Sequence, residues 1–166
     1  MKNVITILCF VSSCIESDPC YNTYTGNATS YEFNPTSTSQ NGISVDQSGY
    51  EVDLDYLDDL TDALELCLRD DLSDPEFKIK HECLNVKIAP NWVIHPDTKN
   101  DQVFECDIPG HEYCYGVVQD GNIIVVTPDL AAYPHETMHV VLGVADPIPK
   151  NLINCKVLDI RNEYAD

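Results

Sequence analysis

Residues 123–143, IIVVTPDLAAYPHETMHVVLG, form the segment that decides the fold. Its opening run, residues 123–127, is entirely β-branched and predicts a strand, which Pro128 ends. Pro134 then suits the first position of a helix, and Gly143 suits the position just past its end. The sequence therefore predicts a strand that is followed closely by a short helix.

The predicted strand is the second half of a hairpin. Another apolar run, residues 115–118, precedes it and is separated from it by residues 119–122, QDGN. Asp-Gly between two apolar runs is a strong hairpin signal, because glycine accepts the positive φ that tight turns between strands require. We therefore expect residues 115–118 and 123–127 to pair with each other.

The predicted helix carries the motif His-Glu-x-x-His at residues 135–139. Positions i and i+4 of a helix share one face, so the imidazoles of His135 and His139 can reach one metal ion. Glu136 lies beside them, where a carboxylate can take a proton from a metal-bound water. This spacing predicts a zinc site. The alternative is an ordinary amphipathic helix in which both histidines have partners within the protein.

The chain upstream of the hairpin predicts both helix and strand. Leucines at spacings of three and four, with acidic residues between them, indicate an amphipathic helix at residues 53–69. Apolar runs at residues 84–89 and 92–95 predict strands. Cys106 and Cys114 frame a loop and are the easiest pair of cysteines to join by a disulfide. The expected fold class is α+β.

The net charge of the chain excludes some partners. Lys and Arg total 9, and Asp and Glu total 28, which gives a formal charge of −19. Such a chain is repelled by phosphate backbones and by anionic lipid head groups, so we expect no nucleic-acid partner. We expect the protein to be a monomer.

Eight cysteines in 166 residues indicate an oxidising compartment. Residues 1–13 combine Lys2 with a short apolar run, which predicts an export signal. The run ends in VSSC, which resembles a bacterial lipobox, where cleavage leaves Cys14 as the lipid-bearing first residue. The alternatives are a plain secretory signal or a short buried strand. The cysteines that remain are enough for three disulfides: Cys20, Cys67, Cys83, Cys106, Cys114 and Cys155.

Residues 14–50 are predicted to be a spacer behind this lipid anchor. From Tyr21 onward they are rich in Asn, Thr, Ser and Gly and contain almost no aliphatic side chains. Such a composition buries too little apolar surface to offset chain entropy, so we expect the spacer to be largely disordered. The folded domain is then expected at residues 51–166, exported to the cell envelope or the extracellular space and attached to the membrane only through the lipid.

The layout around the HExxH helix resembles the zincin metallopeptidases, in which this helix packs beneath a small twisted sheet with another helix behind it. It is also similar to small exported bacterial proteins in which HExxH is followed by Leu-Gly, an acidic turn and a later Cys, as at Gly143, Asp146 and Cys155. The resemblance implies a minimal zincin-like domain that uses zinc to cleave a peptide or protein substrate, with Glu136 as the general base. It also assigns the strand that pairs with extended substrate to Ile123, Ile124, Val125, Val126 and Thr127.

A catalytic zinc takes three protein ligands and keeps one open position, so a third ligand is needed. Asp146 is the first candidate, because it emerges from a turn directly beyond the helix, although it lies one position later than the pattern of the metzincins. Glu163, in an Asn-Glu pair, is similar to the Glu that completes the site in the gluzincins and is the alternative. His95 and His111 are further candidates.

Two alternatives to a peptidase stay open on the sequence. One is a catalytically inactive zincin-like surface lipoprotein that acts as a binding module, because the short chain after the helix leaves little to wall a substrate cleft. The other is an acidic, disulfide-bonded surface protein in which HExxH occurs by chance. Metal content and hydrolysis of a generic substrate distinguish these readings.

Overall fold

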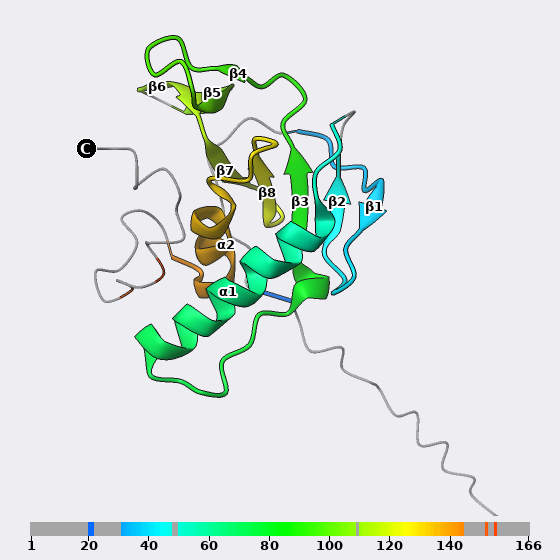
Figure 1. The fold of residues 1–166 in the computed structure, drawn as a ribbon, viewed down its shortest axis with the longest axis vertical. Helices are drawn as coiled ribbons and strands as arrows, with labels where there is room; N and C mark the ends of the chain where they lie inside the picture. The colour runs from blue at the N-terminus through cyan, green and yellow to red at the C-terminus, as the bar shows by residue number, and fades with distance from the viewer. Residues whose placement is uncertain are drawn as a thin grey trace, which may run out of the picture.

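In the part of the chain that the structure describes, two α-helices combine with two β-sheets, and the fold is α+β, as the sequence predicts (Figure 1). The computed structural model describes residues 20–21, 31–47, 50–108, 110–144, 152 and 155. In chain order its elements are β1 (Ser37–Thr38), β2 (Ser44–Asp46), α1 (Leu54–Leu72), the 3-10 helix η1 (His81–Cys83), β3 (Asn85–Ile88), β4 (Val93–Ile94), β5 (Gln102–Ile108), β6 (His111–Cys114), β7 (Gly116–Gln119), β8 (Ile123–Val126) and α2 (Tyr133–Leu142).

The larger sheet has the strand order β1-β2-β3-β8-β7, and the smaller one has the order β4-β5-β6. Strands β2, β3 and β8 run parallel to one another, whereas β1 and β7 are antiparallel to their neighbours. The predicted hairpin is confirmed: β7 pairs with β8, and Gly121 and Asn122 take positive φ angles of 84° and 60° in the turn. The two helices lie together across one face of the larger sheet (Figure 1).

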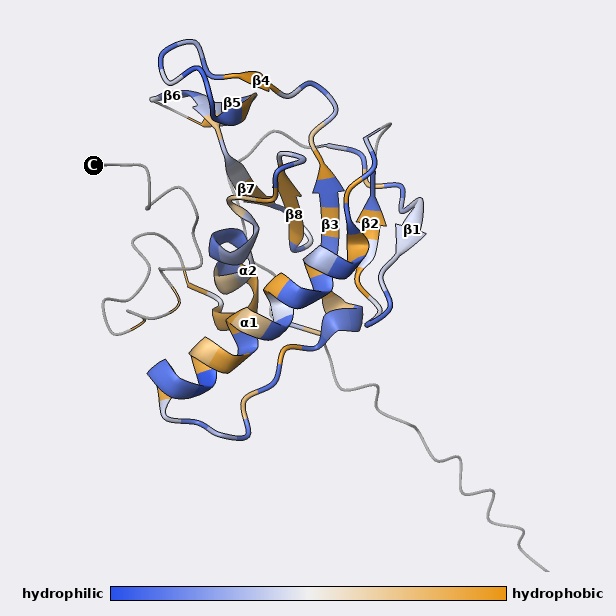
Figure 2. Ribbon diagram, in the orientation of Figure 1, coloured by the Kyte–Doolittle hydropathy of each residue, from blue (hydrophilic) through white to orange (hydrophobic). Residues whose placement is uncertain are grey.

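Strand β8 is buried on both of its faces. Ile124 and Val126 join the core beneath the helices, whereas Val125 joins a second cluster that contains Phe104 of the smaller sheet. A strand covered on both sides has no reason to alternate apolar with polar residues, which explains the continuous apolar run of β8 (Figure 2).

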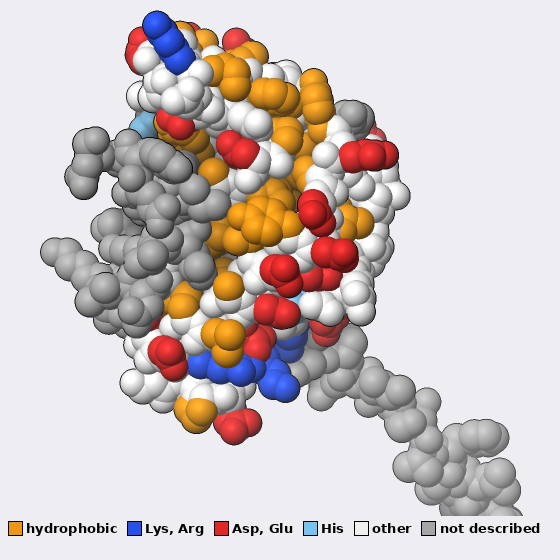
Figure 3. Space-filling model, viewed as in Figure 1, with side chains coloured by type: hydrophobic (Ala, Val, Ile, Leu, Met, Phe, Trp, Pro, Cys, Tyr) orange, Lys and Arg blue, Asp and Glu red, His pale blue; other side chains and the backbone are white. Residues whose placement is uncertain are grey.

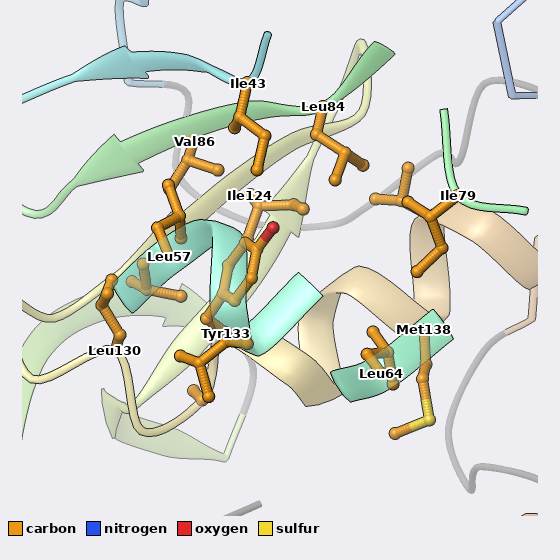
Figure 4. Packing of buried hydrophobic residues seen from close by; sticks show 14 of the residues in the cluster. Ile43, Leu57, Leu64, Ile79, Leu84, Val86, Ile124, Leu130, Tyr133 and Met138 are labelled. Carbon is orange, nitrogen blue, oxygen red and sulfur yellow. The ribbon is translucent and has the colours of Figure 1, made fainter. Parts of the chain in front are cut away.

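The main core forms where both helices meet the sheet. Leu57 and Leu64 of α1 face Tyr133 and Met138 of α2, with Ile124 of β8 between the layers (Figure 4). Each fully buried side chain of this kind contributes roughly 1.5–3 kcal/mol through the hydrophobic effect. The core therefore fixes the position of α2 relative to the sheet.

Helix α1 confirms the predicted amphipathic segment and extends it to Leu72. The carboxylate of Asp53 caps its first turn and accepts hydrogen bonds from the N–H groups of Asp55 and Tyr56 at 3.0 and 3.1 Å. At the other end Ser73 adopts a left-handed conformation and closes the helix.

The prediction that residues 14–50 form a disordered spacer is wrong for residues 31–47, which are part of the domain. Strand β2 lies beside β3 in the larger sheet, and Ile43 and Val45 are fully buried. Polar side chains fix this segment through hydrogen bonds, such as the one from Ser39 Oγ to the Asp58 carboxylate at 2.6 Å. A prediction from composition alone misses the order that comes from hydrogen bonds to residues far along the chain. The folded domain therefore includes residues before position 51.

Three disulfides join the six cysteines that the sequence predicts to be bridged. Three disulfides in one domain indicate an oxidising, exported environment. The pairs are Cys20–Cys83, Cys67–Cys155 and Cys106–Cys114. The last pair confirms the predicted one, but the residues between these two cysteines are mostly strand, because β5 and β6 form a ribbon there. No helix in the part of the chain that the structure describes is long and apolar enough to cross a membrane.

Candidate metal centre

Helix α2 places the HExxH residues and is itself fixed at both ends. Its first residue, Tyr133, is fully buried, and its hydroxyl lies 2.7 Å from Thr61 Oγ1 on α1. Thr61 donates to the carbonyl oxygen of Leu57 at 2.9 Å, so the Tyr133 hydroxyl is the donor between the two. Burial raises the pKa of Tyr133 well above its ordinary value, which keeps this donor protonated. At the other end Gly143 lies just past the helix, as predicted, and takes a left-handed conformation with φ of 63°.

The two histidines of the motif face each other. The Nε2 atoms of His135 and His139 are 3.1 Å apart, and their ring centroids are 4.8 Å apart with the planes at 79°. Two imidazole nitrogens on one tetrahedral zinc, with bonds of about 2.0–2.1 Å, would be separated by about 3.3–3.4 Å. The spacing of the pair therefore fits a shared metal ion with only a small adjustment of the rings.

The hydrogen bond made by Nδ1 of His139 determines which of its two ring nitrogens carries the proton. His139 Nδ1 lies 2.7 Å from the carbonyl oxygen of Val144, which can only accept a hydrogen bond. The proton is therefore on Nδ1, and Nε2 presents its lone pair toward His135. A ligand histidine held in this way by a backbone carbonyl has its tautomer and ring orientation set before a metal binds.

The turn after α2 makes this contact possible. The positive φ at Gly143 reverses the chain direction, so the next residue, Val144, directs its carbonyl back to a side chain within the helix. Glycine adopts such a conformation without steric cost, unlike residues with a Cβ. The residue that ends the helix thus also orients one of the two histidines.

Glu136 lies against the start of β7. Its side chain is buried, with 6% of its surface exposed, and His139 is similarly buried at 4%. A Cβ placed on Gly116 would lie 2.7 Å from Glu136 Cγ and 3.0 Å from Glu136 Oε1. Gly116 is therefore the residue that lets α2 and β7 approach closely enough for the Glu136 side chain to pack between them.

Substitution of Gly116 by alanine tests this close approach. The added methyl group would lie 2.7 Å from both Glu136 Cγ and Ala132 Cβ, so we expect Gly116→Ala to lower the free energy of unfolding. Overpacking of this kind costs about 1–3 kcal/mol, which urea denaturation resolves. Adding Ala132→Gly, at the N-cap residue of α2 where glycine is tolerated, removes one of the two clashes and should recover part of the loss. Unchanged stability of Gly116→Ala would contradict the placement of Glu136 against β7.

The sequence offers four candidates for the third ligand: Asp146, Glu163, His95 and His111. Asp146 and Glu163 both lie outside the described residues, as does Cys14. Among the residues that are described, no three His, Cys, Asp or Glu side chains are grouped closely enough to hold a metal ion. His95 follows β4, stacks edge-on against Tyr113 and accepts from the N–H of Asp97. His111 is exposed at the start of β6, so neither histidine completes a group with the HExxH pair.

The assignment of residues 123–127 as the strand that pairs with substrate is wrong. Strand β8 is bonded to β3 on one side and to β7 on the other, so both of its edges are already occupied. The hairpin prediction identified the two strands correctly but could not show which of them lies at the outside. Among the described residues β7 is the edge strand, because β8 is its one neighbour in the sheet.

Sequence reasoning did not identify two features that hold the site. Gly116 follows directly after Cys114-Tyr115 at the start of a predicted strand, and a glycine there indicates close approach of another backbone or side chain. That signal was available in the sequence. The contribution of Val144 was not, because a main-chain carbonyl carries no side-chain signature.

In comparisons with known proteins, no family model, curated protein or solved structure matches this chain.

Proposed function

We propose that this chain is a zinc-dependent hydrolase, a zincin-like metallopeptidase in which His135 and His139 hold the metal. The observation that carries the proposal is the pair of facing Nε2 atoms, 3.1 Å apart, with the tautomer of His139 fixed by the carbonyl of Val144. A buried carboxylate, that of Glu136, lies next to this pair in sequence. Imidazole pairs at this spacing with an adjacent Glu are suited to metal-assisted hydrolysis.

The order of the helices and strands from α1 onward also supports the zincin-like interpretation. After β1 and β2, the amphipathic helix α1 is followed by strands β3 to β6, then by the β7–β8 hairpin and finally by the HExxH helix α2. Both helices pack on one face of the sheet, and α2 contacts the strands of the hairpin. In the proposed site the third ligand is Asp146 or, alternatively, Glu163.

The proposed chemistry divides between the metal and the protein. Zinc bound by these histidines would polarise a peptide carbonyl and lower the pKa of a water molecule. Glu136 accepts a proton from the attacking water and passes it to the leaving nitrogen. Burial of the carboxylate against Gly116 holds it on the side of the helix that faces β7, and the hydrogen bond from His139 to Val144 keeps its ring from turning.

An extended peptide would bind along the edge of β7 rather than along β8. Only an edge strand can offer main-chain groups to a peptide, and β7 ends the larger sheet. The same strand begins at Gly116, against which Glu136 is packed. A peptide on this edge would therefore pass close to the proposed general base.

We also propose that the domain is exported as a lipoprotein with Cys14 as the lipid-bearing residue. The three disulfides support export. The first of them joins Cys20 to Cys83, and Cys20 lies only six positions after Cys14. A fully extended chain of that length spans about 20 Å, so the domain would be held close to the membrane surface rather than at the end of a long spacer.

Hydrolysis of an unfolded protein tests the proposal. Purified chain is incubated with reduced, alkylated casein, and new amino groups are counted over time. We expect cleavage that a zinc chelator stops and that added zinc restores, because the two histidines cannot activate water without a metal. Zinc binding without cleavage would instead support the inactive binding module, and neither binding nor cleavage would leave HExxH as a chance motif.

A further inference from the structure

A second surface of the molecule has the features of a docking site for another protein. Figure 3 shows hydrophobic side chains that continue from the smaller sheet toward the middle of this face, with acidic side chains around them. Strand β4 exposes Val93 and Ile94, and the half-buried Trp92 just before it contacts Tyr50; these four residues are called the apolar surface. Tyr50 is 38% exposed, Val93 45% and Ile94 47%, and the rings of Tyr50 and Trp92 meet edge to face at 5.7 Å.

Strand β4 lies at the outer edge of the smaller sheet. It pairs with β5 through Val93 opposite Val103 and Ile94 opposite Gln102, and no strand lies on its other side among the described residues. Neighbouring residues of a strand point to opposite faces, so the exposure of both Val93 and Ile94 means that both faces are open here. Edge strands are usually protected by charged side chains or proline, and β4 carries neither.

The hydrogen-bond pattern shows which main-chain groups face outward. The N–H of His95 donates to the carbonyl of Asp101 at 2.8 Å, so these two residues form a bonded pair of the antiparallel ladder. Bonded and non-bonded pairs alternate along such a ladder, which makes the pair of Ile94 and Gln102 a non-bonded one. The N–H and C=O of Ile94 therefore point away from β5, toward the free edge.

The charges around this edge select the kind of partner. Exposed carboxylates flank the apolar surface on both sides in sequence, Glu51 beside Tyr50 and Asp97 in the loop after β4, and Lys99 is the one cation in that loop. The chain as a whole carries a formal charge of −19. A second copy or an anionic membrane would be repelled, whereas a segment rich in Lys or Arg would be attracted.

We propose that β4 and the apolar surface beside it bind an extended, basic segment of another protein that adds to the smaller sheet as a strand. Its main chain bonds to the N–H and C=O of Ile94, and its apolar side chains cover Val93, Ile94 and Tyr50. Its Lys and Arg side chains face the surrounding carboxylates. This surface is separate from the HExxH site, and the inference does not depend on the proposed function.

The test uses Trp92, which is the only tryptophan of the chain and lies within the surface. A short synthetic peptide in which Val and Lys alternate is titrated into the full chain, and the fluorescence of Trp92 and the heat of binding are followed. We expect saturable binding that weakens as salt is added. The same peptide with Glu in place of Lys is expected not to bind.

Two variants separate the main-chain and side-chain contributions. Ile94→Pro removes the outward N–H without affecting the bond of Val93 to β5, and we expect affinity to fall about tenfold. Ile94→Thr keeps the N–H and the β-branched shape and is expected to weaken binding less. Leu66→Thr, at an exposed apolar residue on α1, is the control and should bind like the wild type.

The proposal is overturned if neither peptide binds, if the acidic peptide binds equally well, or if Ile94→Pro binds like the wild type. Sedimentation tests whether a second copy of the chain occupies this surface, and vesicle binding tests whether a membrane does. Self-association that Ile94→Pro abolishes would assign the surface to a second copy. A shift in Trp92 fluorescence on anionic phosphatidylserine vesicles would assign it to a membrane. Either result would also overturn the proposal.

Discussion

Glu136→Gln is expected to reduce kcat for peptide hydrolysis by a factor of about 10²–10⁴ while the protein keeps its zinc. Glutamine has nearly the same shape as glutamate, so the contact with Gly116 and the packing of α2 are kept. It cannot accept a proton at neutral pH, and the attacking water then has no base. The expected loss is therefore in the chemical step, with little change in KM.

The matched control for this variant is Glu112→Gln. Glu112 is an exposed glutamate on β6 that takes no part in the site, so the control changes the net charge by the same amount. Steady-state kinetics of both variants on one substrate, with metal content measured on the same samples, gives the comparison. Activity of Glu136→Gln within a few-fold of the wild type would remove Glu136 from the proposed mechanism.

Loss of the Cys67–Cys155 disulfide is expected to lower the free energy of unfolding by about 4–5 kcal/mol. The bridge joins residues 88 positions apart, so it strongly reduces the conformational entropy of the unfolded chain. It also ties the segment after α2 to α1, where Leu152 is buried and the N–H of Cys155 lies 3.3 Å from the carboxylate of Asp71. The double variant Cys67→Ala/Cys155→Ala removes the link without leaving a free thiol.

The Cys106–Cys114 disulfide provides the control for this prediction. Its cysteines are 8 positions apart, and the same chain-entropy relation gives a loss of about 2–3 kcal/mol for Cys106→Ala/Cys114→Ala. Guanidinium unfolding of both double variants under non-reducing conditions measures the difference. Equal losses, or a larger loss for the short bridge, would show that the long bridge does not stabilise the protein by limiting its unfolded chain.

Local signals in the sequence predicted the elements around the site correctly. Helix α2 begins at Tyr133, one residue before the start that Pro134 predicts, and ends before Gly143 as expected; Asp120-Gly121 marks the turn between β7 and β8. The leucine periodicity identified α1, and the short spacing of Cys106 and Cys114 identified one disulfide. Each of these features depends on residues close together in the chain, where turn chemistry and helical periodicity act directly.

The features that sequence reasoning missed depend on residues far apart in the chain. Strand β8 pairs with β3 although strands β4 to β7 lie between them in the chain, and no local pattern shows that this pairing occupies the second edge of β8. Residues 31–47 look like a linker in composition, yet Asp58 of α1 accepts hydrogen bonds from Ser39 and Asn41 and holds them in place. The position of Glu136 against Gly116 likewise follows from packing between a helix and a strand.

The most direct test of the account is the zinc content of the purified protein and of the variant His139→Ala. If His135 and His139 form the centre of a zinc site, the wild type will hold one zinc per chain after dialysis, and His139→Ala will hold none. His111→Ala, an exposed histidine outside the site, should retain the metal. Absence of zinc from the wild type, or its retention in His139→Ala, would contradict the proposed metal centre.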